Sequence, residues 1–179
     1  MNKEKVSYFA GGCFWCTEAI FDQIFGVTKV QSGFSGGHTN NPSYYQVCSG
    51  STGHAETVKV FYDPLKVKFE ELLNVFFNSH DPTTKDRQGN DIGNHYRSAI
   101  FYTNLHEKEL SEDFILKLNK DKVFTNKILT EIVEFKNFYL AESGHQNYYN
   151  NNKNQPYCSF VIKPKIQLLR KKNVGLLKK

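Results

Sequence analysis

The chain has 179 residues, 39% of them hydrophobic and 15% aromatic, which is enough for one well-filled core and short for two. Charged residues make up 23% and interrupt every apolar run, which excludes the roughly 18 consecutive apolar residues of a membrane span. The net charge is +5, and the segment after residue 162 alone carries seven positive residues and no acidic one. This basicity belongs to a tail, expected as a solvated helix face or a flexible end, and does not indicate nucleic-acid binding. We expect one domain over residues 1–179, with a core at about 5–162 and a basic tail at about 163–179.

Hydrophobic periodicity and turn residues define the elements in chain order. The first half is expected to form a strand over 5–10, a helix over 14–25, a strand over 27–33, a strand over 55–62 and a helix through 69–76. The second half is expected to form a strand over 98–103, a helix through 110–118 and a last strand over 130–135, followed by a polar, asparagine-rich stretch. This order resembles a ferredoxin-like α+β plan: a mixed-sheet core with helices and an irregular C-terminal coil.

Two connections, over residues 34–53 and 81–97, are longer than the usual 4 to 6 residues. Both combine polar and aromatic side chains, and long loops in a compact domain often carry function. We therefore expect a site that is built from these loops around the glycine turn at residues 11–12.

The four cysteines are Cys13, Cys16, Cys48 and Cys158. Ser7 and Gly11 interrupt the N-terminal segment before a signal-peptide core can form, so the cytoplasm is the expected compartment. A structural disulfide framework is not expected there, which leaves reactivity or metal binding.

Cys13 follows two glycines at the expected start of a helix, where free backbone N–H groups and the helix dipole favour a thiolate. The glycines are expected to let other molecules approach the sulfur closely. With Cys16 it forms a Cys-x-x-Cys spacing, typical of a redox pair or of half a zinc site. No second pair with suitable spacing exists, so no metal is expected.

Other side chains of suitable chemistry accompany this thiol. Phe14 and Trp15, the only tryptophan, would form aromatic walls for a small apolar group such as a methyl. Glu56 enters a strand after the first long loop, and an aromatic pocket would raise its pKa enough for it to donate a proton near neutral pH. Asp91 and Tyr96 in the second loop are further candidates.

Several motifs in register resemble the peptide methionine sulfoxide reductase A family. They are Gly12-Cys13-Phe14-Trp15, Tyr44 with Gly53-His54-Ala55-Glu56, His80-Asp81-Pro82, Arg87-Gln88-Gly89-Asn90-Asp91, Tyr96-Arg97-Ser98 and the stretch 139–149 with His145-Gln146. The similarity runs from about Tyr8 to Arg170, nearly the whole chain.

The resemblance implies a thiol-dependent reductase of methionine S-sulfoxide, free and peptide-bound. Cys13 would be the nucleophile, Phe14 and Trp15 would hold the methyl group, and Glu56 would protonate the sulfoxide oxygen. Tyr44, Asp91 and Tyr96 would complete the catalytic site. No bound cofactor is implied; thioredoxin, or dithiothreitol in vitro, would be the reductant, and oxidised proteins or peptides the substrates.

The resolving thiol, which condenses with the sulfenic acid on Cys13, is Cys16 or Cys158. The family often places it in the C-terminal coil, which favours Cys158 slightly. The stretch Asn150 to Asn154 is expected to be mobile enough to let Cys158 reach Cys13. Cys48 is interpreted as a packing residue.

Two other functions compete with this hypothesis: a thioredoxin-like dithiol oxidoreductase that uses Cys13 and Cys16, and a zinc-stabilised interaction domain. Neither explains why Glu56 and the tyrosines occur together.

Overall fold

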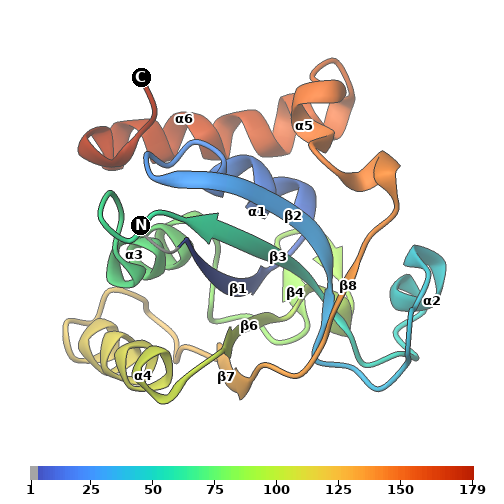
Figure 1. Cartoon of the computed structure of the whole chain (residues 1–179), viewed down its shortest axis with the longest axis horizontal. Coiled ribbons are helices and arrows are strands. Elements are labelled where there is room, and N and C mark those ends of the chain that lie inside the picture. The colour runs from blue at the N-terminus through green and yellow to red at the C-terminus, as the bar shows by residue number, and fades with distance from the viewer. Residues whose placement is uncertain (1–3) are drawn as a thin grey trace.

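The fold is built on a six-stranded mixed sheet, which the computed structural model describes within residues 4–179 (Figure 1). Its strand order is β7-β6-β1-β3-β2-β8, and only β6 and β7 pair in parallel. The strands are β1 (Lys5–Gly11), β2 (Val27–Ser35), β3 (Ala55–Tyr62), β6 (Ser98–Tyr102), β7 (Glu131–Glu134) and β8 (Phe138–Leu140). Residues 1–3, which belong to the segment where no signal-peptide core is expected, lie outside the described part.

Five of these strands confirm the expected segments to within two residues at each end. The expectation that the strand at 130–135 is the last one is wrong, because β8 follows it and pairs with the edge of β2. A short hairpin of β4 (Arg87–Gln88) and β5 (Asp91–Ile92) was also not expected. These pieces have two or three residues each, too few for an alternating pattern to identify them.

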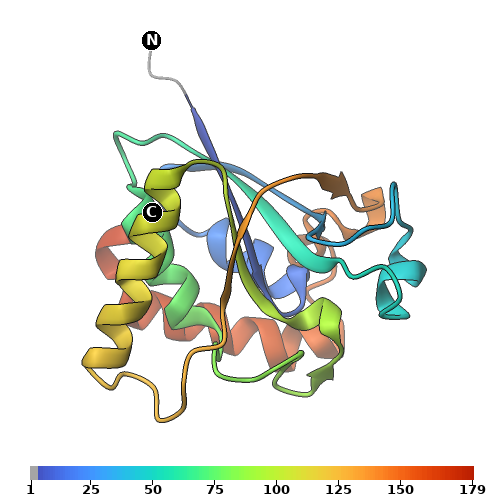
Figure 2. The same cartoon turned by 90° about the horizontal axis from the view of Figure 1, so that it is seen from below.

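Helices α1 (Phe14–Phe21) and α3 (Phe69–Ser79) pack beside the sheet, and α6 (Lys163–Lys172) packs against both of them. Figure 2 shows the three helices on one side of the sheet. Every residue of α1 except Trp15 is buried, as expected for a helix enclosed between a sheet and another helix. The ring of Phe9 on β1 lies 5.0 Å from that of Phe21 and 5.2 Å from that of Phe76, which joins sheet and helices in one core.

The first helix is shorter than expected. It ends at Phe21, and Phe25, which was placed on its apolar stripe, is exposed. Ile24 is buried and pairs with Leu177 in an isolated β-bridge. The pairing of Ile24 with Leu177, more than 150 residues away, thus replaces the last turn that was expected for this helix.

The expectation of an irregular C-terminal coil is wrong. The C-terminal segment contains α5 (Tyr148–Asn151), a π-helical turn (Cys158–Ile162) and α6. The remaining long helix, α4 (Leu105–Lys120), precedes this segment in the chain. Ile166 and Leu169 of α6 are buried, while Lys163, Lys171 and Lys172 are exposed, so the solvated helix face is confirmed and the flexible end is not. Lys165 is partly buried and acts on Cys16. The charge run concealed this apolar stripe, and Pro164 suits the first turn of a helix.

The asparagine-rich stretch is partly ordered by its own side chains. Asn150 and Asn151 belong to α5, and Asn150 Nδ2 donates to Asn147 Oδ1 at 2.7 Å. Asn152 Nδ2 donates to Tyr148 O at 2.9 Å. Within residues 4–179 no helix has the length and apolarity to cross a bilayer.

Candidate active site

Cys13 lies at the junction of β1 and α1, where it is the N-cap residue of the helix. Gly12 precedes it with φ +94°, and a Cβ at this glycine would lie 2.6 Å from Gln88 Cγ. Only glycine combines this backbone with this contact, so the junction is fixed by the protein's own side chain. The expectation that the glycine makes room for another molecule is therefore wrong at Gly12.

Glu56 lies directly beside the start of this helix. It is on β3, only 1% exposed, and its Oε2 accepts a hydrogen bond from the backbone N–H of Phe14 at 2.8 Å. Burial raises the pKa of Glu56 to about 8, although the bond from Phe14 acts in the opposite direction. The expectation that Glu56 is protonated near neutral pH agrees with this environment.

The two thiols of the Cys-x-x-Cys motif lie close enough for each to shift the pKa of the other. Burial raises the pKa of the Cys13 thiol, and the neighbouring Cys13 lowers the pKa of Cys16 to about 7. This environment favours the thiol form of Cys13 rather than the expected thiolate. The helix start does not supply the expected stabilisation because the sulfur is desolvated and the first helical N–H is bonded to Glu56.

The two aromatic residues after Cys13 differ in exposure. Phe14 is buried, and its ring lies 5.6 Å from Phe34 and 6.2 Å from Tyr44. Trp15 is partly exposed and stacks on Tyr148 at 3.7 Å between ring centroids, while its Nε1 donates to His145 Nδ1 at 3.2 Å. Trp15 therefore offers a rigid apolar face that the solvent can reach.

The other predicted residues surround the same carboxyl group. Burial raises the pKa of Tyr44 and of Tyr96, and in both the charge of Glu56 adds to the effect. Asp91 also acts on Glu56, and its Oδ2 accepts a hydrogen bond from the hydroxyl of Tyr157 at 2.7 Å. The structure thus brings together residues from segments far apart in the sequence: Cys13, Cys16, Glu56, Tyr44, Tyr96 and Asp91.

Cys158 is fully buried in the π-helical turn before α6. It belongs to the same core cluster as Cys13 and Cys16, and burial raises its pKa. Among the described residues its thiol makes no hydrogen bond with either of them. Cys158 itself lies in a helical segment, and of the stretch Asn150 to Asn154 only the first two residues are helical.

Sequence reasoning missed three residues of the site. The Tyr157 hydroxyl lies 3.6 Å from Cys16 Sγ, and its ring meets Trp15 edge-on. Glu18, buried in α1, accepts hydrogen bonds from Asn147 N and Tyr148 N and so fixes Tyr148 under Trp15. His145 was quoted within a motif without a role. Only Glu18 could have been found from the sequence, because a carboxylate in an otherwise apolar helix indicates a buried polar role.

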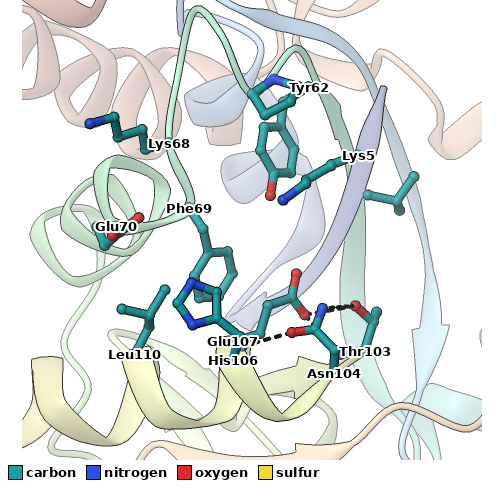
Figure 3. Close-up of a pocket in the computed structure, with 12 residues that line it drawn as sticks. Lys5, Tyr62, Lys68, Phe69, Glu70, Thr103, Asn104, His106, Glu107 and Leu110 are labelled. Atoms are coloured by element: carbon teal, nitrogen blue, oxygen red, sulfur yellow. Dashed lines mark hydrogen bonds between the residues drawn. The ribbon is translucent and has the colours of Figure 1, made fainter. Parts of the chain in front are cut away.

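A separate cavity of about 330 Å³ lies at the other end of β1 (Figure 3). Lys5, Tyr62, Phe69 and Glu107 are among its lining residues, and none of the predicted site residues is. Because β1 extends roughly 3.3 Å per residue over seven residues, this cavity is remote from Cys13.

A buried thiol pair, a carboxyl group protonated near neutral pH and tyrosine hydroxyls define a thiol-based oxidoreductase site. Comparison of the chain with known proteins specifies the family. The model described as "Peptide methionine sulfoxide reductase" matches residues 5–176, and the chain belongs to this family. The resemblance inferred from the motifs is confirmed.

Individual relatives agree. The peptide methionine sulfoxide reductase MsrA of Ruthia magnifica subsp. Calyptogena magnifica is 52% identical over 162 residues, 90% of this chain and 96% of that one. The crystal structure of Mxr1 from Saccharomyces cerevisiae in reduced form has a TM-score of 0.77 and 36% identity, and the match covers 87% of this chain and 90% of that one. The crystal structure of Mxr1 from Saccharomyces cerevisiae in complex with Trx2 has a TM-score of 0.54 and 29% identity, and the match covers 82% of this chain and 85% of that one.

Proposed function

We propose that this protein reduces the S epimer of methionine sulfoxide, free and in oxidised peptides or proteins, with Cys13 as the nucleophile. The observation that carries this proposal is the position of Glu56, whose carboxyl group is bonded to the residue after Cys13 and has a pKa of about 8. A sulfoxide oxygen leaves only after protonation, so the nucleophile needs an acid beside it. Trp15 provides an accessible apolar face for the methyl group.

In the first step Cys13 Sγ attacks the sulfoxide sulfur and the oxygen takes a proton from Glu56. The hydroxyls of Tyr44 and Tyr96 stabilise the oxygen as its charge develops. Cys13 is a thiol at rest, so its own proton must also leave, and the neighbouring Cys16 has a pKa lowered to about 7. We assign Cys16 as the acceptor of this proton. The oxygen remains on Cys13 as a sulfenic acid and methionine is released.

In the second step a thiol attacks the sulfenic sulfur, forming a disulfide and releasing water. We propose Cys16 for this step, because it lies within one helical turn of Cys13 and each thiol shifts the pKa of the other. The proton that Cys16 took from Cys13 passes to the departing hydroxyl, which leaves as water. Cys158, which the sequence favours slightly, would first have to leave a buried helical segment. The sum of the steps converts one sulfoxide and two thiols into methionine, a disulfide and water.

Restoring the thiols requires an external dithiol, and we assign thioredoxin to this role. Support comes from Mxr1, which is similar in sequence and forms a complex with Trx2. No bound cofactor takes part. A cycle that depends on such a reductant belongs in a reducing compartment, so we infer the cytoplasm as the site of action.

We also propose a ferredoxin-like core. The strands β1, β2, β3 and β6 with α1 and α3 follow the order β-α-β-β-α-β, and the spatial order β6-β1-β3-β2 is antiparallel throughout. We treat the whole chain as one catalytic domain, because α6 packs against α1 and α3.

The two sulfoxide epimers separate this function from the alternatives. The reduced protein should convert a peptide with methionine S-sulfoxide to the methionine form in the presence of dithiothreitol and leave the R epimer unchanged. Chromatography of the products with each epimer gives the answer. Equal conversion of both epimers, or of neither, would contradict the proposal.

A further inference from the structure

Cys48, Glu56 and His95 form a cluster within the loops of the active site. Cys48 ends α2 (Tyr44–Cys48), Glu56 is on β3, and His95 lies in the 3-10 turn Asn94–Tyr96. One atom able to bind a metal from each residue, a thiol sulfur, a carboxylate oxygen and an imidazole nitrogen, lies within 4.8 Å of the other two. The proposed chemistry uses only Glu56 of this set.

The hydrogen bonding of the cluster is incomplete. His95 is 5% exposed, and its Nδ1 is buried and has no hydrogen-bond partner among residues 4–179. Glu56 uses only Oε2 in the hydrogen bonds of the described residues. Buried polar atoms are nearly always paired, so an unpaired nitrogen on an imidazole that lies close to a thiol and a carboxyl group indicates a missing ligand.

We propose that Cys48, Glu56 and His95 bind a Zn²⁺ ion. A thiolate, a carboxylate and an imidazole are the donors that zinc takes in proteins, and three protein ligands leave the fourth position of a tetrahedral site to water. Metal–ligand distances of about 2.0 to 2.3 Å correspond to ligand atoms roughly 3.3 to 3.7 Å apart. From their present separations of up to 4.8 Å, the ligand atoms need to approach one another by at most about 1.5 Å, which side-chain rotation can supply.

Neighbouring groups suit a cation. The Tyr44 hydroxyl lies close enough to the Cys48 thiol for each group to shift the pKa of the other, and Tyr44 acts to lower the pKa of the thiol. Asp91 lies close enough to act on both Glu56 and His95, adding negative charge beside the site. Such outer contacts usually orient metal ligands and strengthen binding.

Zinc in this position would inhibit sulfoxide reduction reversibly, since Glu56 would hold a metal in place of its proton. This consequence rests on the proposed function of Glu56, whereas the binding itself does not. Direct measurement of binding therefore separates a failure of the site from a failure of the function.

The dithiol Cys13 and Cys16 is the competing location for the metal. Co²⁺ distinguishes them, because a sulfur-to-metal charge-transfer band reports how many thiolates bind. The proposed site supplies one thiolate and the dithiol supplies two.

The experiment titrates the reduced full-length protein with Zn²⁺ against a chromophoric chelator and records the Co²⁺ spectrum in parallel. We expect one equivalent to bind with a one-thiolate spectrum. The affinity should fall at least 100-fold in Cys48→Ser and in His95→Gln, and persist in Cys158→Ser and in the double variant Cys13→Ser/Cys16→Ser. Wild-type binding in Cys48→Ser, or loss of binding in the double variant, would overturn the site.

Activity measured in the same variants completes the test. With EDTA present, Cys48→Ser and His95→Gln should reduce sulfoxide, which shows that they fold, and added Zn²⁺ should inhibit them far less than wild type. If either fails to fold, Cys48→Ala and His95→Asn replace it in the titration. Equal inhibition of wild type and of both folded variants would contradict the inference.

Discussion

Glu56 and Glu107 are carboxyl groups buried near opposite ends of the same sheet, with exposures of 1% and 7%. Glu107, in the first turn of α4, accepts three hydrogen bonds: from Ser7 Oγ at 2.9 Å, Thr103 N at 2.7 Å and Thr103 Oγ1 at 2.9 Å. Figure 3 shows it at the cavity wall. Glu56 accepts one hydrogen bond, from Phe14 N.

The comparison teaches that burial alone does not make a carboxyl group reactive. Three donors saturate the carboxyl oxygens of Glu107, so we interpret it as a structural tie between β1 and α4. Glu56 has one donor for the same burial, so its neutral form is favoured and it retains a proton to give. The predictions below test this contrast.

The largest effect is expected for Cys13→Ser, which should abolish sulfoxide reduction. An alcohol at this position is neither ionised nor nucleophilic enough toward sulfur. Product formation in a single turnover, followed by chromatography, is the measurement, with Cys158→Ser as the matched cysteine control. Turnover by Cys13→Ser above the uncatalysed rate would remove this residue from the mechanism.

Replacing Glu56 by Gln should slow the first turnover by about 10² to 10⁴-fold, because an amide can donate a hydrogen bond but no proton. The fold should be retained. Rapid-quench measurement with the reduced enzyme in excess gives the rate. A rate within a factor of two of wild type would mean that Glu56 is no more reactive than Glu107.

For the two candidate resolving thiols we expect different outcomes. Cys16→Ser should yield at most one equivalent of methionine and then stall with thioredoxin, whereas Cys158→Ser should continue. Peptide mapping of the oxidised wild type should find a Cys13–Cys16 disulfide. A Cys13–Cys158 disulfide as the dominant species would reverse the assignment.

The smallest effect on activity is expected for Glu107→Gln. The amide keeps one acceptor oxygen, so the bonds from either Ser7 or Thr103 are lost, which should lower the free energy of unfolding by about 1 to 3 kcal/mol. Denaturant titration measures this loss, with the exposed Glu109→Gln expected to stay within about 0.5 kcal/mol. If the folded Glu107→Gln also lost its first turnover, the distinction between the two carboxyl groups would fail.

The sequence predicted the parts of the molecule that depend on local pattern. Alternation placed β3, and the glycine turn placed Cys13 at the start of a helix. Contacts between distant segments could not be predicted from the sequence: the Tyr157 hydroxyl donates to Asp91 across 66 residues, and Ile24 pairs with Leu177.

The protonation states of the site residues could not be predicted from the sequence either, because they depend on desolvation. The position of Cys13 suggested a thiolate, but its pKa depends on burial and on Glu56 occupying the first helical N–H. The same burial was foreseen for Glu56 only on the condition of an aromatic pocket. Chemical type was therefore readable from the sequence, and protonation state required the three-dimensional surroundings.

The most direct test of the central claim, that Glu56 gives the proton, is the pH dependence of the first turnover in wild type and in Glu56→Gln, with EDTA present. The rate should rise as Cys16 ionises at a pKa of about 7 and fall as Glu56 loses its proton at a pKa of about 8. In Glu56→Gln the fall at high pH should disappear while the rise remains. A fall near pH 8 that persists in Glu56→Gln, or a wild-type rate that stays constant above pH 8, would contradict the account.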